Sequence, residues 1–256
     1  MNTALVLSYL GTGYHGWQRQ NNGLTIQELL ERAVRESCGL RDVYVSGCGR
    51  TDAGVHAAFY VCNFKSEVRI PADKLPLALN ARLPEAVAVR RAVPVAEDFD
   101  ARFSCRSKEY TYLIHNSRVR DPFLLGRACF YPQPLDERLM AEAARHFVGR
   151  QDFAAVRNLG TPVRSTVRTV LSCTAERRGD RLRVRVAADG FLYNMVRAIA
   201  GTLIYVGIGK LRPDEIADVL RSGDRDRAGP TAPACGLYLT ALDYGLPSLD
   251  GRAELF

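Results

Sequence analysis

The sequence predicts an α+β protein built from two ferredoxin-like halves with antiparallel sheets. In the first half, strand-like and helix-like hydrophobic patterns follow one another in the order β-α-β-β-α-β, which is the split βαβ pattern of ferredoxin-like domains. In the second half strands and helices alternate again, although no close sequence repeat links the halves. We therefore expect two domains, 1–100 and 101–256, in a chain of 256 residues that can bury ample core.

The first half contains one helix whose two ends are both marked in the sequence. Thr25 and Glu28 form a capping-box pattern at its start, and Gly39 marks its end. A second helix begins at Pro71 and runs to about residue 80. The first helix places these apolar side chains on one face: Ile26, Leu29, Leu30, Ala33 and Val34. The strands of this half are expected at residues 4–9, 42–48, 58–65 and 87–95.

The second half contains a long hairpin at residues 167–188, which turns at Arg178-Gly179-Asp180. The polar segment 222–233, which contains Gly and Pro, is expected to be a loop. The other expected elements are a strand at 108–115, a helix at about 135–148 that stops at Gly149, a helix at 191–206, a short helix after Pro213 and a strand at 236–244.

The charge of the chain favours an anionic partner. The net charge is +7, the pI is about 9.2, and 31 of the 35 basic residues are Arg (35 minus four Lys). Arg offers a planar fork to phosphate and stacks on bases, so this bias favours nucleic acid. A genome rich in Arg codons would produce the same bias without any such partner.

The seven cysteines are widely spaced, odd in number and include no Cys-x-x-Cys pair. This pattern indicates reduced thiols in a cytoplasmic protein and disfavours a zinc site or a disulfide framework. The N-terminus enters a strand-like run directly, so no signal peptide is expected. The longest apolar stretch, 191–208, contains Asn194 and Arg197 and is too short and polar to span a membrane.

The most informative segment is Cys-Gly-Arg-Thr-Asp-Ala-Gly-Val-His-Ala at residues 48–57. It places Arg50 and Asp52 two residues apart, between Gly49 and Gly54, in a turn flanked by strand-like sequence. A carboxylate held beside a guanidinium suits a nucleophile or a general base, and the glycines allow a substrate close to the backbone. The competing interpretation is a surface Asp in a Gly turn with a chance ion pair.

Three further patterns each allow a structural and a functional interpretation. Arg197 lies in a helix that is apolar on nearly every side, so its guanidinium needs a partner. Tyr110 and Tyr112 share a strand face, where one ring could stack on a nucleobase or both could be core. The alternation of Arg and apolar residues over 181–186 puts the arginines on one strand face, which could follow an RNA backbone or be a solvated outer face.

Two motifs resemble known binding sites, but their surroundings in the sequence do not support that function. Gly11-Thr12-Gly13-Tyr14-His15-Gly16 fits the dinucleotide-binding pattern, but the helix starts near Thr25 rather than within the glycines. The polar stretch that intervenes, with Trp17, Gln18 and Arg19, is better interpreted as an RNA-contacting loop. Asp52 and His56 are four residues apart without a third ligand nearby, so no metal site is expected.

Five motifs in order resemble those of the tRNA pseudouridine synthase A family. They are Gly49–Ala57 (GRTDAGVHA), Tyr14–Gln20 (YHGWQRQ), Ala101–Ser104 with Tyr110–Tyr112 (ARFS and YTY), Phe191–Arg197 (FLYNMVR) and Gly236–Leu239 (GLYL). They span about residues 9 to 244, nearly the whole chain. One departure is Leu10, where the family usually has Asp; it puts a secondary contact near the first strand in doubt, not the chemistry.

The resemblance implies an isomerase that converts uridine to pseudouridine at positions 38, 39 and 40 in the anticodon stem-loop of tRNA. It implies catalytic roles for Asp52, Arg50, Tyr110 and Arg197, with Arg197 as the partner of Asp52 and Tyr110 as the residue that stacks on uracil. The substrate-binding set that we predict is Tyr110, Trp17, Gln18, Arg19 and His56. Tyr112 is left as core.

The resemblance also implies no cofactor, no metal and a cytoplasmic homodimer whose two halves frame a basic cleft. Two alternatives remain open from the sequence. One is a pseudouridine synthase of the same superfamily with other uridine targets. The other is a non-catalytic tRNA-binding module.

Overall fold

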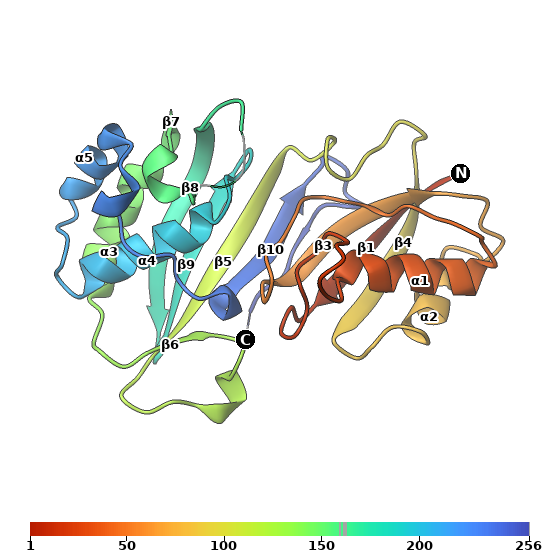
Figure 1. Ribbon diagram of the computed structural model, residues 1–256, viewed down its shortest axis with the longest axis horizontal. Helices are drawn as coiled ribbons and strands as arrows, with labels where there is room; N and C mark the ends of the chain where they lie inside the picture. The colour runs from red at the N-terminus through yellow and green to blue at the C-terminus, as the bar shows by residue number, and fades with distance from the viewer. Residues whose placement is uncertain (159, 161–162, 256) are drawn as a thin grey trace. The chain divides into compact units, whose positions relative to one another are not determined.

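The computed structural model describes residues 1–158, 160 and 163–255, and its helices and strands form an α+β protein (Figure 1). The chain divides into two compact units. Unit 1 comprises Met1–Arg106 and Leu239–Phe256, and unit 2 comprises Ser107–Tyr238. The predicted domains differ from these units in the C-terminal segment, which the sequence alone assigned to the second half. No helix in the described part of the chain is long and apolar enough to cross a bilayer.

Unit 1 contains the six elements in the predicted order: β1 (Asn2–Tyr9), α1 (Ile26–Cys38), β2 (Ser46–Gly47), β3 (His56–Lys65), α2 (Leu75–Asn80) and β4 (Val87–Val95). The strands lie in the order β4-β1-β3-β2, and every neighbouring pair is antiparallel. β10 (Leu237–Asp243) lies beside β3, and β11 (Gly251–Arg252) pairs with β10. The helices α1 and α2 pack against each other on one face of this sheet (Figure 1).

Both predicted ends of α1 are confirmed. The Thr25 side chain accepts a hydrogen bond from the Glu28 amide, and Gly39 adopts the left-handed conformation (φ 66°) that closes the helix. The five apolar residues of its predicted face are all buried. β2 is only two residues long, shorter than the strand expected at 42–48, because its ladder with β3 covers only Ser46 and Gly47.

Buried amides hold the segment after β4 against the sheet of unit 1. Asn2 Nδ2 donates to the carbonyls of Ala96 and Phe99, at 2.9 and 2.8 Å. Asn63 Nδ2 donates to Asn2 Oδ1 at 2.9 Å, and Asn63 Oδ1 accepts from the Ala101 amide at 2.9 Å. β1 itself is buried along almost its whole length, and its first residue binds this segment.

Unit 2 is built on an antiparallel sheet in the order β5-β9-β8-β7. Its helices cover one face: α3 and α4 pack together, α3 contacts β8, and α4 contacts β5 (Figure 1). The elements are β5 (Ser107–Asn116), β6 (Cys129–Tyr131), α3 (Glu137–Ala144), β7 (Gly149–Asp152), β8 (Val167–Arg178), β9 (Arg181–Ala188), α4 (Met195–Gly207) and α5 (Glu215–Ser222). The long hairpin turns at Gly179 (φ 61°), as predicted.

Two helix ends in unit 2 differ from the predicted ones for backbone reasons. α4 starts at Met195 rather than near 191, because Asn194 adopts the left-handed conformation (φ 59°) that no helix interior allows. α3 ends at Ala144 and continues as a 3₁₀ turn over Arg145–Phe147 before Gly149 (φ 109°). Periodicity did not predict β6 or β7, which are three and four residues long.

A strap formed by residues 228–233 packs directly on α4. The Gly229 amide donates to Thr202 Oγ1 at 3.0 Å, and the Ala232 amide donates to the Arg197 carbonyl at 3.1 Å. A Cβ added at Gly201 would lie 1.7 Å from the Pro230 carbonyl oxygen. The absence of a side chain at Gly201 is therefore what allows the strap to lie on the helix.

We predict that Gly201→Ala lowers the free energy of unfolding by about 1–3 kcal/mol, because the added methyl must push the strap away from α4. Gly190→Ala is the matched control. Its Cβ would meet only Arg168 side-chain atoms at 3.5 and 3.6 Å, so we expect a change within about 0.5 kcal/mol. Urea unfolding of both variants measures this difference, and equal losses would contradict the steric argument.

Candidate active site

The Asp52 loop of unit 1 is held by backbone hydrogen bonds to the loop that follows β1. The Trp17 amide donates to the Thr51 carbonyl at 3.2 Å, and the Gly54 amide donates to the Tyr14 carbonyl at 3.2 Å. Within the loop, the Val55 amide donates to the Asp52 carbonyl at 3.1 Å, and Gly54 has φ 78°. These hydrogen bonds fix the backbone on both sides of Asp52. Asp52 itself is half-buried.

Two glycines make this loop-on-loop contact possible. A Cβ at Gly16 would lie 2.2 Å from the Thr51 carbonyl oxygen and 3.0 Å from the Asp52 carbonyl carbon. A Cβ at Gly11 would lie 2.0 Å from the Val55 carbonyl oxygen. The glycines of the apparent dinucleotide motif therefore serve close packing against the Asp52 loop.

Aromatic side chains support the loop from beneath. Tyr60 donates its hydroxyl hydrogen to the Gly49 carbonyl at 2.6 Å, and the Tyr9 hydroxyl lies 2.9 Å from Thr51 Oγ1. Trp17 stacks on Tyr60 with ring centroids 4.3 Å apart. These contacts fix the backbone immediately before Arg50, whose own side chain is exposed.

Two of the predicted substrate-binding residues lie in the interior of unit 1. Trp17 is 4% exposed, and His56 is fully buried with its Nδ1 accepting a hydrogen bond from the Gly11 amide at 2.9 Å. The neutral ring therefore carries its proton on Nε2. Their burial favours a role in supporting the Asp52 loop, whereas the predicted direct contact with RNA requires exposed atoms.

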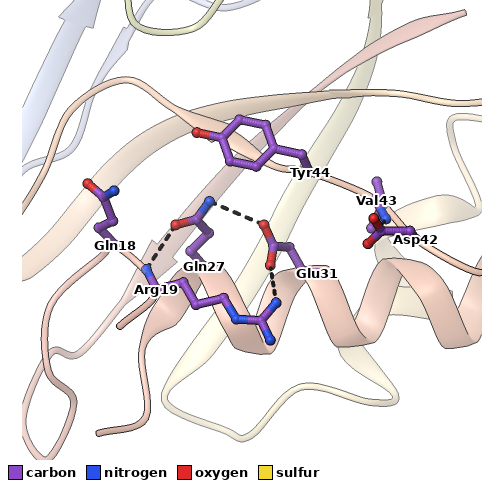
Figure 2. A pocket seen from close by; sticks show the side chains of 7 residues that line it. All are labelled: Gln18, Arg19, Gln27, Glu31, Asp42, Val43 and Tyr44. Carbon is purple, nitrogen blue, oxygen red and sulfur yellow. Dashed lines mark hydrogen bonds and ion pairs between the residues drawn. The ribbon is translucent and has the colours of Figure 1, made fainter. Parts of the chain in front are cut away.

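Gln18 and Arg19 lie at the rim of a cavity of about 290 Å³ in unit 1, together with Tyr44 (Figure 2). Gln27 and Glu31, both buried on α1, form its floor. The Arg19 amide donates to Gln27 Oε1 at 2.9 Å, and the Arg19 guanidinium donates to Glu31 Oε2 at 3.4 Å. The segment that carries Gln18 and Arg19 is thus tied to the first helix.

Glu31 and Gln27 also bind the chain on the other side of the cavity. Glu31 Oε1 accepts from Gln27 Nε2 at 3.2 Å and from the Val45 amide at 3.3 Å, while Gln27 Nε2 donates to the Val45 carbonyl at 3.0 Å. Neither residue was among the site residues predicted from the sequence. They could have been recognised as a polar pair four residues apart, beside the apolar face of the predicted first helix. That helix begins directly after the loop.

In unit 2, Tyr110 lies on β5 and is 8% exposed, with its ring packed edge-on against Phe191 at 5.1 Å between centroids. Tyr112 on the same strand is fully buried, and its hydroxyl donates to the Pro233 carbonyl at 2.7 Å. Burial raises the pKa of Tyr112 well above its usual value. The assignment of Tyr112 to the core is confirmed.

Arg197 lies in the first turn of α4 and is half-buried. Its Nε donates to the Ala232 carbonyl at 2.8 Å, and its Nη1 donates to Asn194 Oδ1 at 2.8 Å. The strap and the left-handed Asn194 therefore both orient the guanidinium. The helix around it is buried on nearly every side, as its composition predicts.

The arginines of β9 form no uniform outer face. Arg183 is buried, while Arg181 and Arg185 are half-buried, and Arg185 pairs with Glu176 across the hairpin at 3.2 Å. The alternating apolar residues Leu182, Val184 and Val186 are fully buried, as the strand period predicts.

The chemistry of other groups offers no competing site within residues 1–158, 160 and 163–255. No three His, Cys, Asp or Glu side chains come together there in a way that could hold a metal ion. Burial raises the pKa of five thiols, to about 12 for Cys173. These thiols stay protonated at neutral pH, which disfavours a cysteine nucleophile among them.

We predict that Gly16→Ala destabilises unit 1 more than Gly13→Ala does. Both glycines have positive φ (80° and 83°), so both substitutions carry the same strain of about 1–2 kcal/mol. Only Gly16 meets the Asp52 loop, whereas nothing lies within 4 Å of a Cβ at Gly13. The clash should add about 1–3 kcal/mol to the loss measured by urea unfolding. Equal losses for the two variants would mean that the loops do not depend on this contact.

The sequence of the chain matches known proteins of one family. A family profile described as tRNA pseudouridine synthase matches residues 5–104 and 143–245. A tRNA pseudouridine synthase A of Thermoanaerobacter sp. (strain X514) is 44% identical over 243 residues, which cover 95% of this chain and 99% of that protein. Relatives of the same description in Acetivibrio thermocellus and Methylacidiphilum infernorum are 44% and 46% identical, covering 95% and 94% of this chain and 99% and 94% of theirs.

Among solved structures, a Cbf5-Nop10-Gar1 complex resembles the chain with a TM-score of 0.36 and 15% identity, over 93% of this chain and 48% of that one. That likeness is too distant to indicate a shared function. The profile covers most of the chain, and the relatives match almost from end to end. The chain therefore belongs to the tRNA pseudouridine synthase family.

Proposed function

We propose that this protein converts uridine to pseudouridine at positions 38, 39 and 40 of the anticodon stem-loop of tRNA, with Asp52 as its catalytic group. Membership of the family makes the protein an isomerase that acts on tRNA. The observation that supports Asp52 is its place in a loop whose backbone is fixed by two hydrogen bonds to residues 14–17 and by close glycine contacts. Such preorganisation is what a catalytic carboxylate requires.

The reaction breaks the N1–C1′ bond, turns the uracil and joins C5 to C1′. The proton lost from C5 is balanced by a proton gained at N1, so the product is an isomer of the substrate. Because nothing is oxidised or hydrolysed overall, the chemistry needs no cofactor. Asp52 acts either as a nucleophile at C1′ or C6, or as a base at the ribose C2′.

The target base must leave its stack before it can react, which costs a few kcal/mol. The exposed Arg50, two residues from Asp52, takes the vacated space or holds the phosphate of the flipped nucleotide. Tyr110 stacks on the uracil and takes part in removing the C5 proton. The residue is 8% exposed, and its ring packs edge-on against Phe191.

Arg197 is proposed as the partner that keeps Asp52 ionised, because an opposite charge lowers the pKa of a carboxyl group. The guanidinium is already oriented by the Ala232 carbonyl and the Asn194 side chain. An Arg in this role supplies a planar set of donors whose direction is fixed by its other hydrogen bonds.

We further propose that two ferredoxin-like halves frame a basic cleft and that the protein is a cytoplasmic homodimer. The strand order β4-β1-β3-β2 with antiparallel neighbours supports the ferredoxin-like assignment for unit 1. The net charge of +7 supports a basic surface for RNA.

Two rival functions make different predictions. A synthase of the same superfamily with other targets would need the same Asp52 and would modify different uridines. A non-catalytic tRNA-binding module would bind tRNA equally well without Asp52 and would form no pseudouridine.

We predict that Asp52→Asn lowers the rate of pseudouridine formation at least about 100-fold while tRNA still binds. Asp73→Asn is the control, because Asp73 is an exposed carboxylate of unit 1 that pairs with Lys74. Carbodiimide primer extension on an unmodified tRNA with uridines 38–40 reports both rate and position. Wild-type signal at other uridines would move the substrate, and an active Asp52→Asn protein would overturn the catalytic assignment.

We also predict that Arg19→Gln weakens tRNA binding and reduces the slope of log K against log[salt] by about 1, because one phosphate contact is lost. Arg212→Gln is the control, since Arg212 is an exposed arginine paired with Asp214 and Glu215. The slopes are measured by filter binding between roughly 50 and 200 mM salt, a range over which the affinity of such complexes falls steeply. An unchanged slope for Arg19→Gln would remove Arg19 from the RNA contact.

A further inference from the structure

A turn of unit 1 presents an aromatic ring to solvent without an obvious structural reason. Phe103 is 81% exposed, and the guanidinium carbon of Arg102 lies 5.3 Å from the centroid of its ring. Both belong to the ARFS motif at residues 101–104, and neither of these two side chains has a role in the core of unit 1 or in the proposed chemistry.

The backbone of this turn is fixed by the residues on either side of Phe103. Asp100 Oδ1 accepts hydrogen bonds from the amides of Arg102 and Phe103 at 2.8 and 3.0 Å. The Ser104 amide donates to the Asp100 carbonyl at 2.9 Å, and the Asp100 amide donates to Ser104 Oγ at 3.2 Å. The exposed ring is thus carried by an ordered turn, not by a loose loop.

The same turn is anchored in the core through Ala101, which is fully buried. Its amide donates to Asn63 Oδ1 at 2.9 Å, and its carbonyl accepts from the Tyr244 hydroxyl at 2.7 Å. Because the backbone is already ordered, a ligand that contacts Phe103 does not have to pay for ordering the turn.

The turn also lies close to the Asp52 loop. Ser46 Oγ donates to Asp100 Oδ2 at 3.0 Å, and Ser46 lies on β2, four residues before Arg50. Asp52 follows Ser46 by six residues, and six extended residues span at most about 22 Å. The turn that carries the ring is therefore joined through Ser46 to the segment that leads into the Asp52 loop.

We propose that Arg102 and Phe103 form a stacking platform for an unpaired tRNA base near the uridine that reacts, an inference that rests on the proposed function. An exposed aromatic ring beside an arginine suits a nucleobase and its phosphate, since every base has a π face and the guanidinium adds charge and cation–π attraction. A protein partner fits less well. Within residues 96–106 Phe103 is the sole exposed large apolar side chain, and interface cores require a contiguous apolar patch.

The test compares Phe103→Ala, Phe103→Trp and Leu77→Ala by their Kd for an unmodified tRNA transcript. Leu77 is the matched control, because it is an exposed apolar residue of unit 1 (67%) on α2. We expect Phe103→Ala to raise Kd by about 5- to 100-fold, in line with the loss of one stacked base. Phe103→Trp should bind about as well as wild type, and Leu77→Ala should not change Kd.

A second readout locates the base. Transcripts with a single 5-bromouridine at successive anticodon-loop positions are irradiated in the complex, and the cross-linked peptide is identified by mass spectrometry. We expect one position to cross-link to the peptide that contains Phe103, and the cross-link to disappear in Phe103→Ala.

Neither readout requires catalysis, so each can contradict the platform without contradicting the proposed function, or the reverse. If the wild-type protein forms no pseudouridine, but its cross-link is lost in Phe103→Ala, the platform is supported and the proposed function is overturned. Unchanged binding and cross-linking in Phe103→Ala, in a protein that still modifies tRNA, would overturn the platform alone. A fall in affinity that accompanies dissociation of an oligomer in sedimentation would assign Phe103 to a contact between copies and would also overturn it.

Discussion

The geometry of the Asp52 loop depends on one steric constraint: two backbone segments lie closer together than side chains would allow. Gly11 and Gly16 meet the carbonyl oxygens of Val55 and Thr51, where an added Cβ would come within 2.0 and 2.2 Å. The hydrogen bonds from Trp17 and to Tyr14 form across this contact. A loop fixed in this way holds the carboxylate in place before any substrate arrives, which is the condition for efficient positioning.

Three of the supporting side chains around this contact bind backbone groups. Tyr60 binds the Gly49 carbonyl, His56 binds the Gly11 amide, and Gln27 binds the Arg19 amide. In unit 2 the roles are exchanged: the backbone carbonyl of Ala232 orients a side chain, the guanidinium of Arg197. Groups that are not proposed to react therefore hold the segments and side chains that are, as residues around an active site commonly do.

The sequence predicted the elements whose signals are local. The capping box at Thr25, the left-handed Gly39 and the hairpin turn at Gly179 are each determined by neighbouring residues, so they could be found without the structure. The late start of α4 could not, because the left-handed backbone of Asn194 leaves no trace in the hydrophobic periodicity. β6 and β7 are too short to produce a detectable alternation.

For the site, the sequence indicated Asp52 and its glycines because the segment is unusual in itself. It did not distinguish buried from exposed residues of the loop that follows β1. Trp17 and Arg19 are two residues apart, yet Trp17 packs inside while the Arg19 side chain is 59% exposed. That difference is decided by Tyr60, Gln27 and Glu31, which come from elements further along the chain.

The place of Leu239–Phe256 in unit 1 has a consequence for the order in which the protein can be completed. A ribosome releases residues 1–106 well before it releases the last segment, so unit 1 must wait while all of unit 2 is made. During that interval the edge of β3 that β10 will occupy is open, and an open strand edge can pair with another chain. The Tyr244 hydroxyl that binds Ala101 also arrives only then. The nascent chain therefore passes through a stage in which the part of unit 1 that carries Asp52 is translated but still lacks a strand.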